Sequence, residues 1–179
     1  KPYRAKRYKY PSFSINKIIM TQIDFYVLTQ TTAIARLHYA CRLAEKAINQ
    51  GHRIAIALDD ESQAQTLSDY LWSFKPESFL PHMLQNDEPQ TKALEQAATD
   101  SEKVLDDVKR SAPIALIWGK DNEHYHDILI NLSQKIPEGF SRYRRAFEIV
   151  VQEDDCLKIT RSHFQFYRER GYPLKSHAL

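Results

Sequence analysis

The segment RIAIALDDESQAQTL, residues 53–67, decides the fold of this chain. Residues 53–58 are almost wholly apolar, as expected of a strand that is buried on both faces. Asp59 and Asp60 follow at once, and carboxylates in front of a helical pattern accept hydrogen bonds from the free amides of the first turn. A buried strand that leads directly into a capped helix is the building unit of an α/β protein.

The same alternation of strands and helices continues on both sides of this segment. Upstream, we expect a strand at residues 23–28 and a helix that Thr31 or Thr32 caps and that ends at Gly51, which suits a left-handed C-terminal cap. Downstream, the expected elements are a third short strand at Phe79 and Leu80, strands at 114–118, 128–132 and 147–151, a short helix at 140–145 and a last helix at 155–170. These repeats predict a doubly wound, mainly parallel sheet with helices on both faces.

The composition is that of an ordinary globular domain. The 179 residues are 42% hydrophobic and 27% charged, enough for one sizeable core, and no apolar run approaches the about 20 residues that span a membrane. Cys41 and Cys156 lie far apart in the sequence, and Cys41 falls on an apolar helix position. We therefore expect a single domain in a reducing cytoplasm, without disulfides.

Charge is distributed unevenly along the chain. Residues 1–19 contain six Lys/Arg and no Asp/Glu, residues 157–179 contain five Lys/Arg and one Glu, and the total of +2 therefore leaves −8 on residues 20–156. So acidic a body argues against a protein that coats DNA, whereas a local basic end suits a site for one acidic ligand. Residues 1–19 show neither a helical nor a strand period and no secretory signal, so we interpret them as an extension ahead of a native start at Met20. A basic arm for nucleic acid is the competing hypothesis.

The sequence supports no catalytic, cofactor or metal site. A Rossmann-like fold would bind phosphate through a glycine-rich loop, but none of the four glycines follows the first strand, and neither GxGxxG nor GxxxxGK[ST] occurs. His124 and His126 lack a third strong metal ligand, and no serine lies in a GxSxG context. Asp59, Asp60 and Glu61 are explained as capping and first-turn residues of a helix.

The last predicted helix carries the strongest candidate for a binding site. One stripe on a 3.6-residue period, with an aromatic ring beside it, consists of Lys158, Arg161, Phe164, Gln165 and Arg168. Tyr167 falls near its edge. Cations beside a ring can hold a short acidic peptide that ends in an aromatic residue. The competing interpretation places Phe164, Phe166 and Tyr167 in the core, with the basic side chains as solvated neighbours.

The segment LWSFKPESFLPH, residues 71–82, is a second candidate. Pro76 and Pro81 forbid a continuous helix, and the aromatic side chains are too many for a simple surface loop. A rigid connector of this kind either seals a core or presents anchors to another protein. Trp72 is the better anchor because indole rings dominate interface hot spots, whereas Phe79 stays open between an interface and a core strand.

In this order the motifs resemble one family, the chi subunit of the bacterial DNA polymerase III holoenzyme. The similar segments begin at Met20 and are DFYVL (24–28), IAIALDDESQA (54–64), LWSFKPESFLPH (71–82), APIALIW (112–118), DILINL (127–132) and FEIVVQEDD (147–155), followed by a basic-aromatic helix. The chain departs from the family between residues 85 and 110, where the pattern of residues 90–109 predicts a surface helix inserted into the domain 20–179.

The resemblance implies that the last helix binds the acidic C-terminal tail of single-stranded-DNA-binding protein. Arg161 and Arg168 fit the family's pattern best, and Phe164 stands at an aromatic position. Gln165 occupies a place where a lysine is usual, and Lys158 lies at the start of the helix, which is one residue shorter than expected.

The resemblance also implies that Trp72, Phe79 and Pro81 contact the psi subunit, which links chi to the clamp loader. A repair helicase can share that surface. The expected function is a non-catalytic adapter of DNA polymerase III, without a cofactor. Two other classes compete with it: a small α/β nucleotide- or cofactor-binding enzyme, and a direct binder of single-stranded DNA through residues 1–19 and the last helix.

Overall fold

The structure is a computed structural model, and it describes residues 20–75, 80–84, 112–119 and 127–179. The strands are β1 (Gln22–Val27), β2 (Ile54–Leu58), β3 (His82–Leu84), β4 (Ile114–Trp118), β5 (Ile128–Asn131), β6 (Arg145–Val150) and β7 (Leu174–Ala178). The helices are α1 (Ala33–Asn49), α2 (Glu61–Ser73) and α4 (Asp154–Glu169), with a 3-10 turn η2 at Phe140–Arg142.

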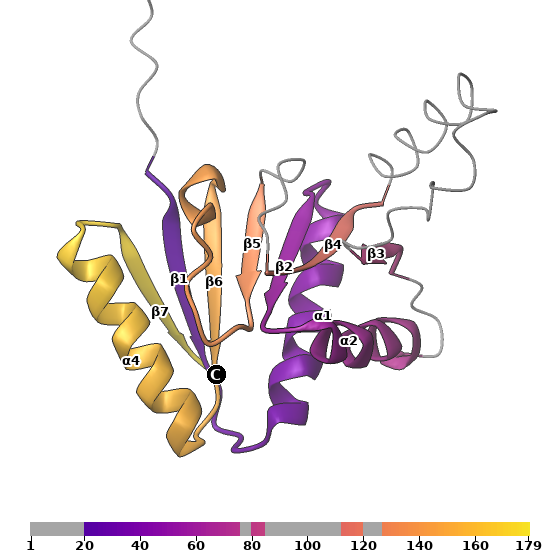
Figure 1. Cartoon of the computed structure of the whole chain (residues 1–179), viewed down its shortest axis with the longest axis horizontal. Helices are drawn as coiled ribbons and strands as arrows, with labels where there is room; N and C mark the ends of the chain where they lie inside the picture. Colours follow the sequence, from indigo (N-terminus) through magenta and orange to yellow (C-terminus); the bar gives the residue numbers. More distant parts are fainter. Residues whose placement is uncertain (1–19, 76–79, 85–111, 120–126) are drawn as a thin grey trace, which may run out of the picture.

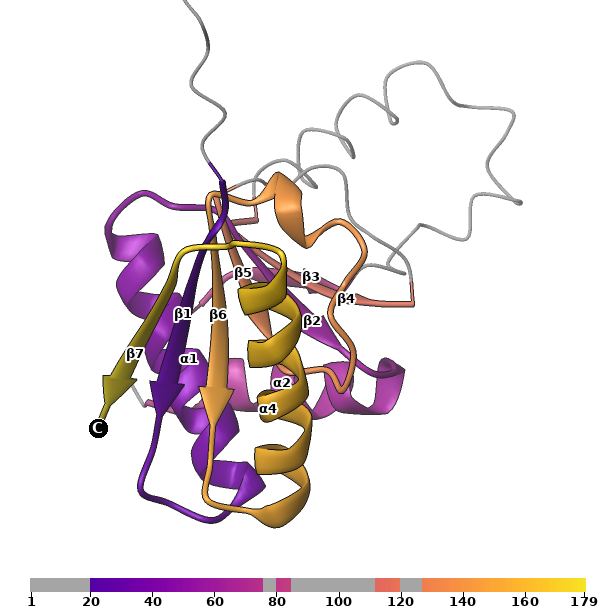
Figure 2. The same cartoon turned by 90° about the vertical axis from the view of Figure 1, so that its left-hand side faces the viewer.

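The strands form one parallel sheet in the order β3-β4-β2-β5-β6-β1-β7 (Figure 1). Helices α1 and α2 cover one face of the sheet, and α4 packs on the other face near β1 and β6 (Figure 2). The predicted doubly wound fold with helices on both faces is therefore confirmed.

Alternation within the central strands sorts their side chains between the two faces. In β2, Ile54 and Ile56 join the core beneath α1 and α2, whereas Ala55 and Ala57 face the opposite side. All four are buried, and burying each isoleucine contributes about 1.5–3 kcal/mol. Cys41, a predicted core residue, is buried on α1, and burial raises the pKa of its thiol to about 12.

The helix ends use the residues that the sequence indicated. Thr32 caps α1, because its hydroxyl oxygen accepts the Ala35 amide at 3.3 Å, and Asp60 caps α2 by accepting the Gln63 amide at 2.8 Å. Gly51 ends α1 with φ at +81°, a backbone conformation that residues with a Cβ seldom adopt. The predicted left-handed cap is confirmed.

Two predictions around residues 71–82 are wrong. Leu80 is not part of a strand, and the third strand is β3 at His82–Leu84. Trp72 belongs to the last turn of α2 rather than to an extended connector, because the helix continues to Ser73 before the prolines. Phe79, His124, His126 and the predicted helix at 90–109 all lie outside the described residues.

Strand β7, at one edge of the sheet, has no counterpart in the sequence prediction. It pairs in parallel with β1, but most of its side chains are exposed or half-buried, so its sequence LKSHA shows no apolar alternation. A strand at an edge needs backbone pairing on one side only, and a hydrophobic period is not required for that.

Candidate partner-binding surfaces

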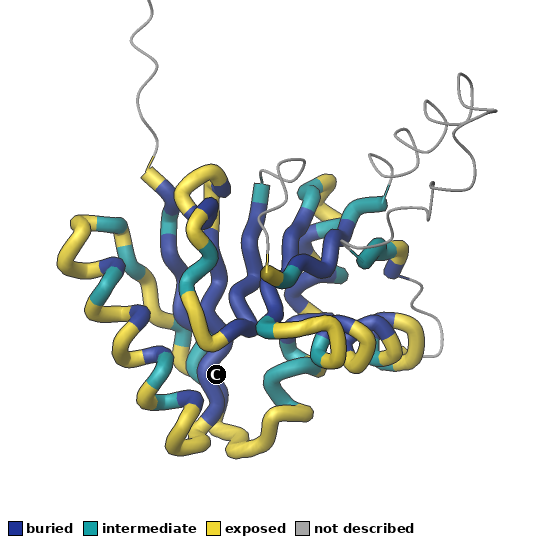
Figure 3. The backbone as a smooth tube through the Cα atoms, viewed as in Figure 1, coloured by how far each residue is buried: buried dark blue, intermediate teal, exposed yellow. Residues whose placement is uncertain are grey.

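Helix α4 directs one stripe of side chains inward and another to solvent. The inward stripe consists of Cys156, Thr160, His163 and Tyr167, all of them buried. The outward stripe consists of the five residues predicted from the sequence, Lys158, Arg161, Phe164, Gln165 and Arg168, all of them exposed. Figure 3 shows the same division along the helix, with exposed turns facing away from the sheet.

The arginines of the outward stripe are available to a ligand. Within the described ranges, neither Arg161 nor Arg168 has an ion-pair partner. The Arg168 guanidinium lies 5.9 Å from the centroid of the Phe164 ring, a cation–π arrangement. Phe164 is 38% exposed, and its inner edge meets the ring of Phe25 at a centroid distance of 5.3 Å. The Phe164 ring therefore packs against Phe25 on one side and is exposed to solvent on the other.

The other two members of the stripe already have local partners. Lys158 pairs with Asp155 at 3.0 Å, but both side chains are largely exposed, so this bond is weak and exchangeable. The Gln165 amide donates to Glu169 at 2.7 Å. The strongest ligand groups of the stripe are thus the two arginines.

The helical period predicted that Tyr167 lies near the edge of the outward stripe, and this prediction is wrong. Its side chain is fully buried, and it makes edge contacts with the rings of Phe25, Phe140 and Tyr172. Phe166 is half-buried over Phe140, so the competing core interpretation holds for these two aromatic residues.

A buried polar network fixes α4 to the sheet, and sequence reasoning missed it. One oxygen of Glu148 on β6 accepts hydrogen bonds from the Tyr167 hydroxyl at 3.0 Å, the Asn131 amide at 3.0 Å and His163 at 3.2 Å. All four side chains are buried. The sequence does contain a sign of this network, namely Glu148 as a single carboxylate inside the apolar strand FEIVV. A buried carboxylate must accept hydrogen bonds from donors in the core.

His163 uses both of its ring nitrogens in this network. Its Nδ1 faces the Glu148 carboxylate, and its Nε2 faces the Gln134 carbonyl at 3.1 Å, so both bonds are donated only by the protonated ring. Burial and Arg36 each lower the pKa of His163. The hydrogen bond to Glu148, the negative charge of Glu148 and the hydrogen bond to the Gln134 carbonyl all raise it, and the net pKa lies above the ordinary value. The bond between His163 and Glu148 therefore holds the middle of α4 to β6.

The second predicted surface lies where α2 meets β3. Trp72 is 51% exposed, and its ring lies 5.1 Å from that of His82. His82 Nδ1 donates to the Leu80 carbonyl at 2.9 Å, so Nε2 accepts the Ser68 hydroxyl at 2.8 Å. Pro81, between these residues, is exposed. The structure thus fixes His82 beside the exposed indole of Trp72, with Pro81 exposed at the position directly before His82 in the chain.

The described residues show no group of three potential metal ligands, and none of their helices is long and apolar enough to cross a bilayer. Asp59 of the acidic cluster accepts the Gln134 amide at 2.8 Å and the Gln63 side-chain amide at 3.2 Å. Its oxygens tie α2 to the loop after β5. The capping and first-turn explanation of the acidic cluster therefore holds for Asp60 and Glu61 but not for Asp59.

The fold and its exposed surfaces define a doubly wound α/β protein of the Rossmann-like class. A family model described as DNA polymerase III chi subunit, HolC, matches residues 20–175, and the chain therefore belongs to this family of accessory replication subunits. It is 39% identical over 160 residues to the DNA polymerase III subunit chi of Pseudomonas aeruginosa, covering 89% of this chain and 98% of the relative. The Escherichia coli subunit chi is 26% identical over 162 residues, with 88% and 97% covered.

Solved structures with a similar fold are far more distant in sequence. The crystal structure of T4 UvsW superposes with a TM-score of 0.58 at 9% identity, covering 89% of this chain. Yeast (S. cerevisiae) Dbp5 bound to Nup159 and ADP gives 0.56 at 9% identity, covering 87%. This chain spans 41% of the length of each of those chains, so the similarity concerns the fold alone.

Proposed function

We propose that this chain is a non-catalytic adapter that binds the acidic tail of single-stranded-DNA-binding protein through α4 and the psi subunit through the α2–β3 surface. The observation that carries the proposal is the pair Arg161 and Arg168, which have no ion-pair partner in the described ranges and flank the exposed ring of Phe164. Carboxylates of a tail would bind the guanidiniums, and a terminal aromatic side chain would pack on the ring.

The positions of the two surfaces support a bridging role. Helix α4 packs near β1 and β6, whereas α2 and β3 lie at the opposite end of the sheet (Figure 1). Two partners can therefore bind at once without collision. A weak tail contact gains effective concentration when the same molecule is fixed to the clamp loader through psi.

Replacing Arg161 or Arg168 with alanine is expected to weaken binding of an acidic, phenylalanine-terminated peptide about tenfold or more. The reason is the loss of a charge-assisted bond at an exposed site, so the wild-type affinity should also fall as salt rises. Isothermal titration calorimetry measures both effects.

Arg144→Ala is the matched control, because it removes an exposed arginine outside α4. It should leave the peptide affinity unchanged, and circular dichroism should show all three variants folded. If both α4 variants bind the peptide as tightly as the wild type, the tail site is not on this stripe.

Trp72→Ala is expected to weaken capture of the psi subunit about thirtyfold or more, since an exposed indole of this kind is a typical hot spot. A pull-down with purified psi measures the effect, and the acidic peptide should still bind to α4. Undiminished psi capture by this variant would assign Trp72 to a purely structural role against His82.

A further inference from the structure

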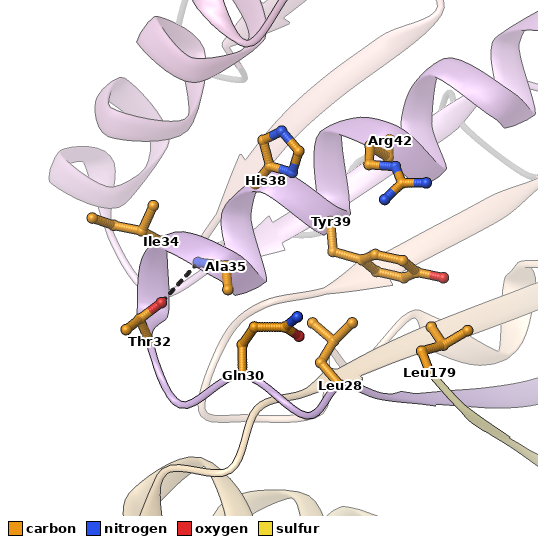
Figure 4. A pocket seen from close by; sticks show the side chains of 9 residues that line it. All are labelled: Leu28, Gln30, Thr32, Ile34, Ala35, His38, Tyr39, Arg42 and Leu179. Atoms are coloured by element: carbon orange, nitrogen blue, oxygen red, sulfur yellow. Dashed lines mark hydrogen bonds between the residues drawn. The ribbon is translucent and has the colours of Figure 1, made fainter.

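A groove runs along α1 on the face of the sheet opposite α4. It consists of two adjoining hollows, one of about 640 Å³ and one of about 290 Å³. Tyr39 and Arg42 line both hollows, so the two form one continuous surface, which we call the α1 groove. Figure 4 shows its larger hollow, with α1 on one side and Leu28 and Leu179 on the other.

The smaller hollow is the basic end of the α1 groove. Among the described residues that line it, the basic ones are Arg42, Lys46, His52 and Arg145, and none is Asp or Glu. The one acidic residue of α1, Glu45, accepts a bond from Lys75 of the segment after α2 at 2.6 Å. An anion in this hollow would therefore meet several basic side chains, of which Arg145 is also paired with Asp24.

Arg145 is held in place by a buried carboxylate. Its Nε and Nη2 donate to Asp24 at 3.1 and 2.8 Å, and Asp24 is fully buried. His177 on β7 donates to the other oxygen of Asp24 at 2.8 Å. Within the described ranges, Arg145 Nη1 has no acceptor, so the guanidinium is fixed with one edge left for a ligand.

The larger hollow is aromatic and apolar. Tyr39 is half-buried, its ring lies 5.7 Å from that of Tyr26, and the Arg42 guanidinium lies 6.0 Å from its centroid. Burial raises the pKa of Tyr39, so its hydroxyl stays neutral and can donate. The wall is completed by Leu28 and by Ile34, which is 61% exposed.

We propose that the α1 groove binds single-stranded nucleic acid, with phosphates at Arg42, Lys46 and Arg145 and a base against Tyr39. Cations that follow one another along a helix, next to an aromatic ring, are the arrangement that proteins use for single strands without sequence preference. Arg42 and Lys46 lie one turn apart on α1 and Arg145 lies on β6, so the groove can bind several anionic groups in succession, as the phosphates of a strand supply them. Because α4 lies on the opposite face, strand and tail can bind together.

The test is fluorescence anisotropy of the full chain with a labelled oligo(dT) of about 15 nucleotides across a salt series. The variant is Arg42→Glu with Lys46→Glu, and both side chains are exposed, so the fold should persist. Binding should weaken at least about tenfold, and the slope of log affinity against log salt should shrink by about two. Tyr39→Leu, which keeps an apolar contact, should weaken binding about fivefold or more.

Lys135→Glu with Arg144→Glu is the matched control, because it makes the same change in net charge at exposed positions between β5 and β6. The control should keep the wild-type affinity and salt slope. Equal losses in both double variants, or none in the α1 variant, would overturn the proposal. So would an α1 variant that binds the oligonucleotide normally and loses an acidic peptide instead.

Discussion

Replacing Glu148 with alanine is expected to lower the free energy of unfolding by about 3–5 kcal/mol. The carboxylate is buried and accepts bonds from Asn131, His163 and Tyr167, so its removal leaves three buried polar side chains without their shared acceptor. Urea unfolding followed by circular dichroism measures the change. Glu148→Gln retains a carbonyl acceptor at this place and should cost less than the alanine variant.

The pH dependence of stability separates the ion pair from simple loss of packing. In the wild type, the raised pKa of His163 gives a stabilisation that is complete below about pH 6.5 and is lost as pH rises through the raised value. In Glu148→Ala, burial and Arg36 both favour the neutral ring, so stability should instead fall as the pH is lowered. Parallel pH profiles for the two proteins would contradict the buried ion pair.

Replacing Tyr167 with alanine is expected to cost about 3–5 kcal/mol of unfolding free energy. Tyr167 is among the largest fully buried side chains and packs among the rings of Phe25, Phe140 and Tyr172, so alanine leaves a cavity between α4 and the sheet. Thermal unfolding measures the loss, which should appear without any ligand present.

Two substitutions on the same helix show whether packing causes this loss. Tyr167→Phe keeps the ring and removes only the bond to Glu148, so about 1–2 kcal/mol should be lost. Phe164→Ala affects a ring that is 38% exposed and should weaken peptide binding more than stability. If Phe164→Ala destabilises the fold as much as Tyr167→Ala, the division between inward and outward stripes is wrong.

The sequence predicted the central fold because β2 and α2 carry strong local signals. Residues 54–58 are continuously apolar, and Asp60 provides a cap whose geometry depends on neighbouring backbone only. The edge strand β7 escaped prediction because its stability comes from pairing with β1 and from the contact of His177 with Asp24. Neither partner is near it in the sequence.

The sequence predicted which residues of α4 form the exposed stripe, but not which of its aromatic residues face the core. Helical periodicity grouped Arg161, Phe164 and Arg168 correctly on one exposed stripe. It could not decide that Tyr167 faces the core, because adjacent positions differ by about 100° and only the docking angle against the sheet selects among them. The α1 groove is lined by residues of β1, α1, β6 and Leu179, which are far apart in the sequence. No local sequence pattern could therefore predict it.

The division of α4 into two stripes has an evolutionary consequence. Substitutions on the inward side are constrained by the Glu148 network and by ring packing, whereas the outward positions are exposed. Gln165 is such an outward position, because it is exposed and a substitution there would break one exposed bond to Glu169. Substitutions on the outward side can therefore change this surface in single steps, without a compensating change elsewhere in the domain.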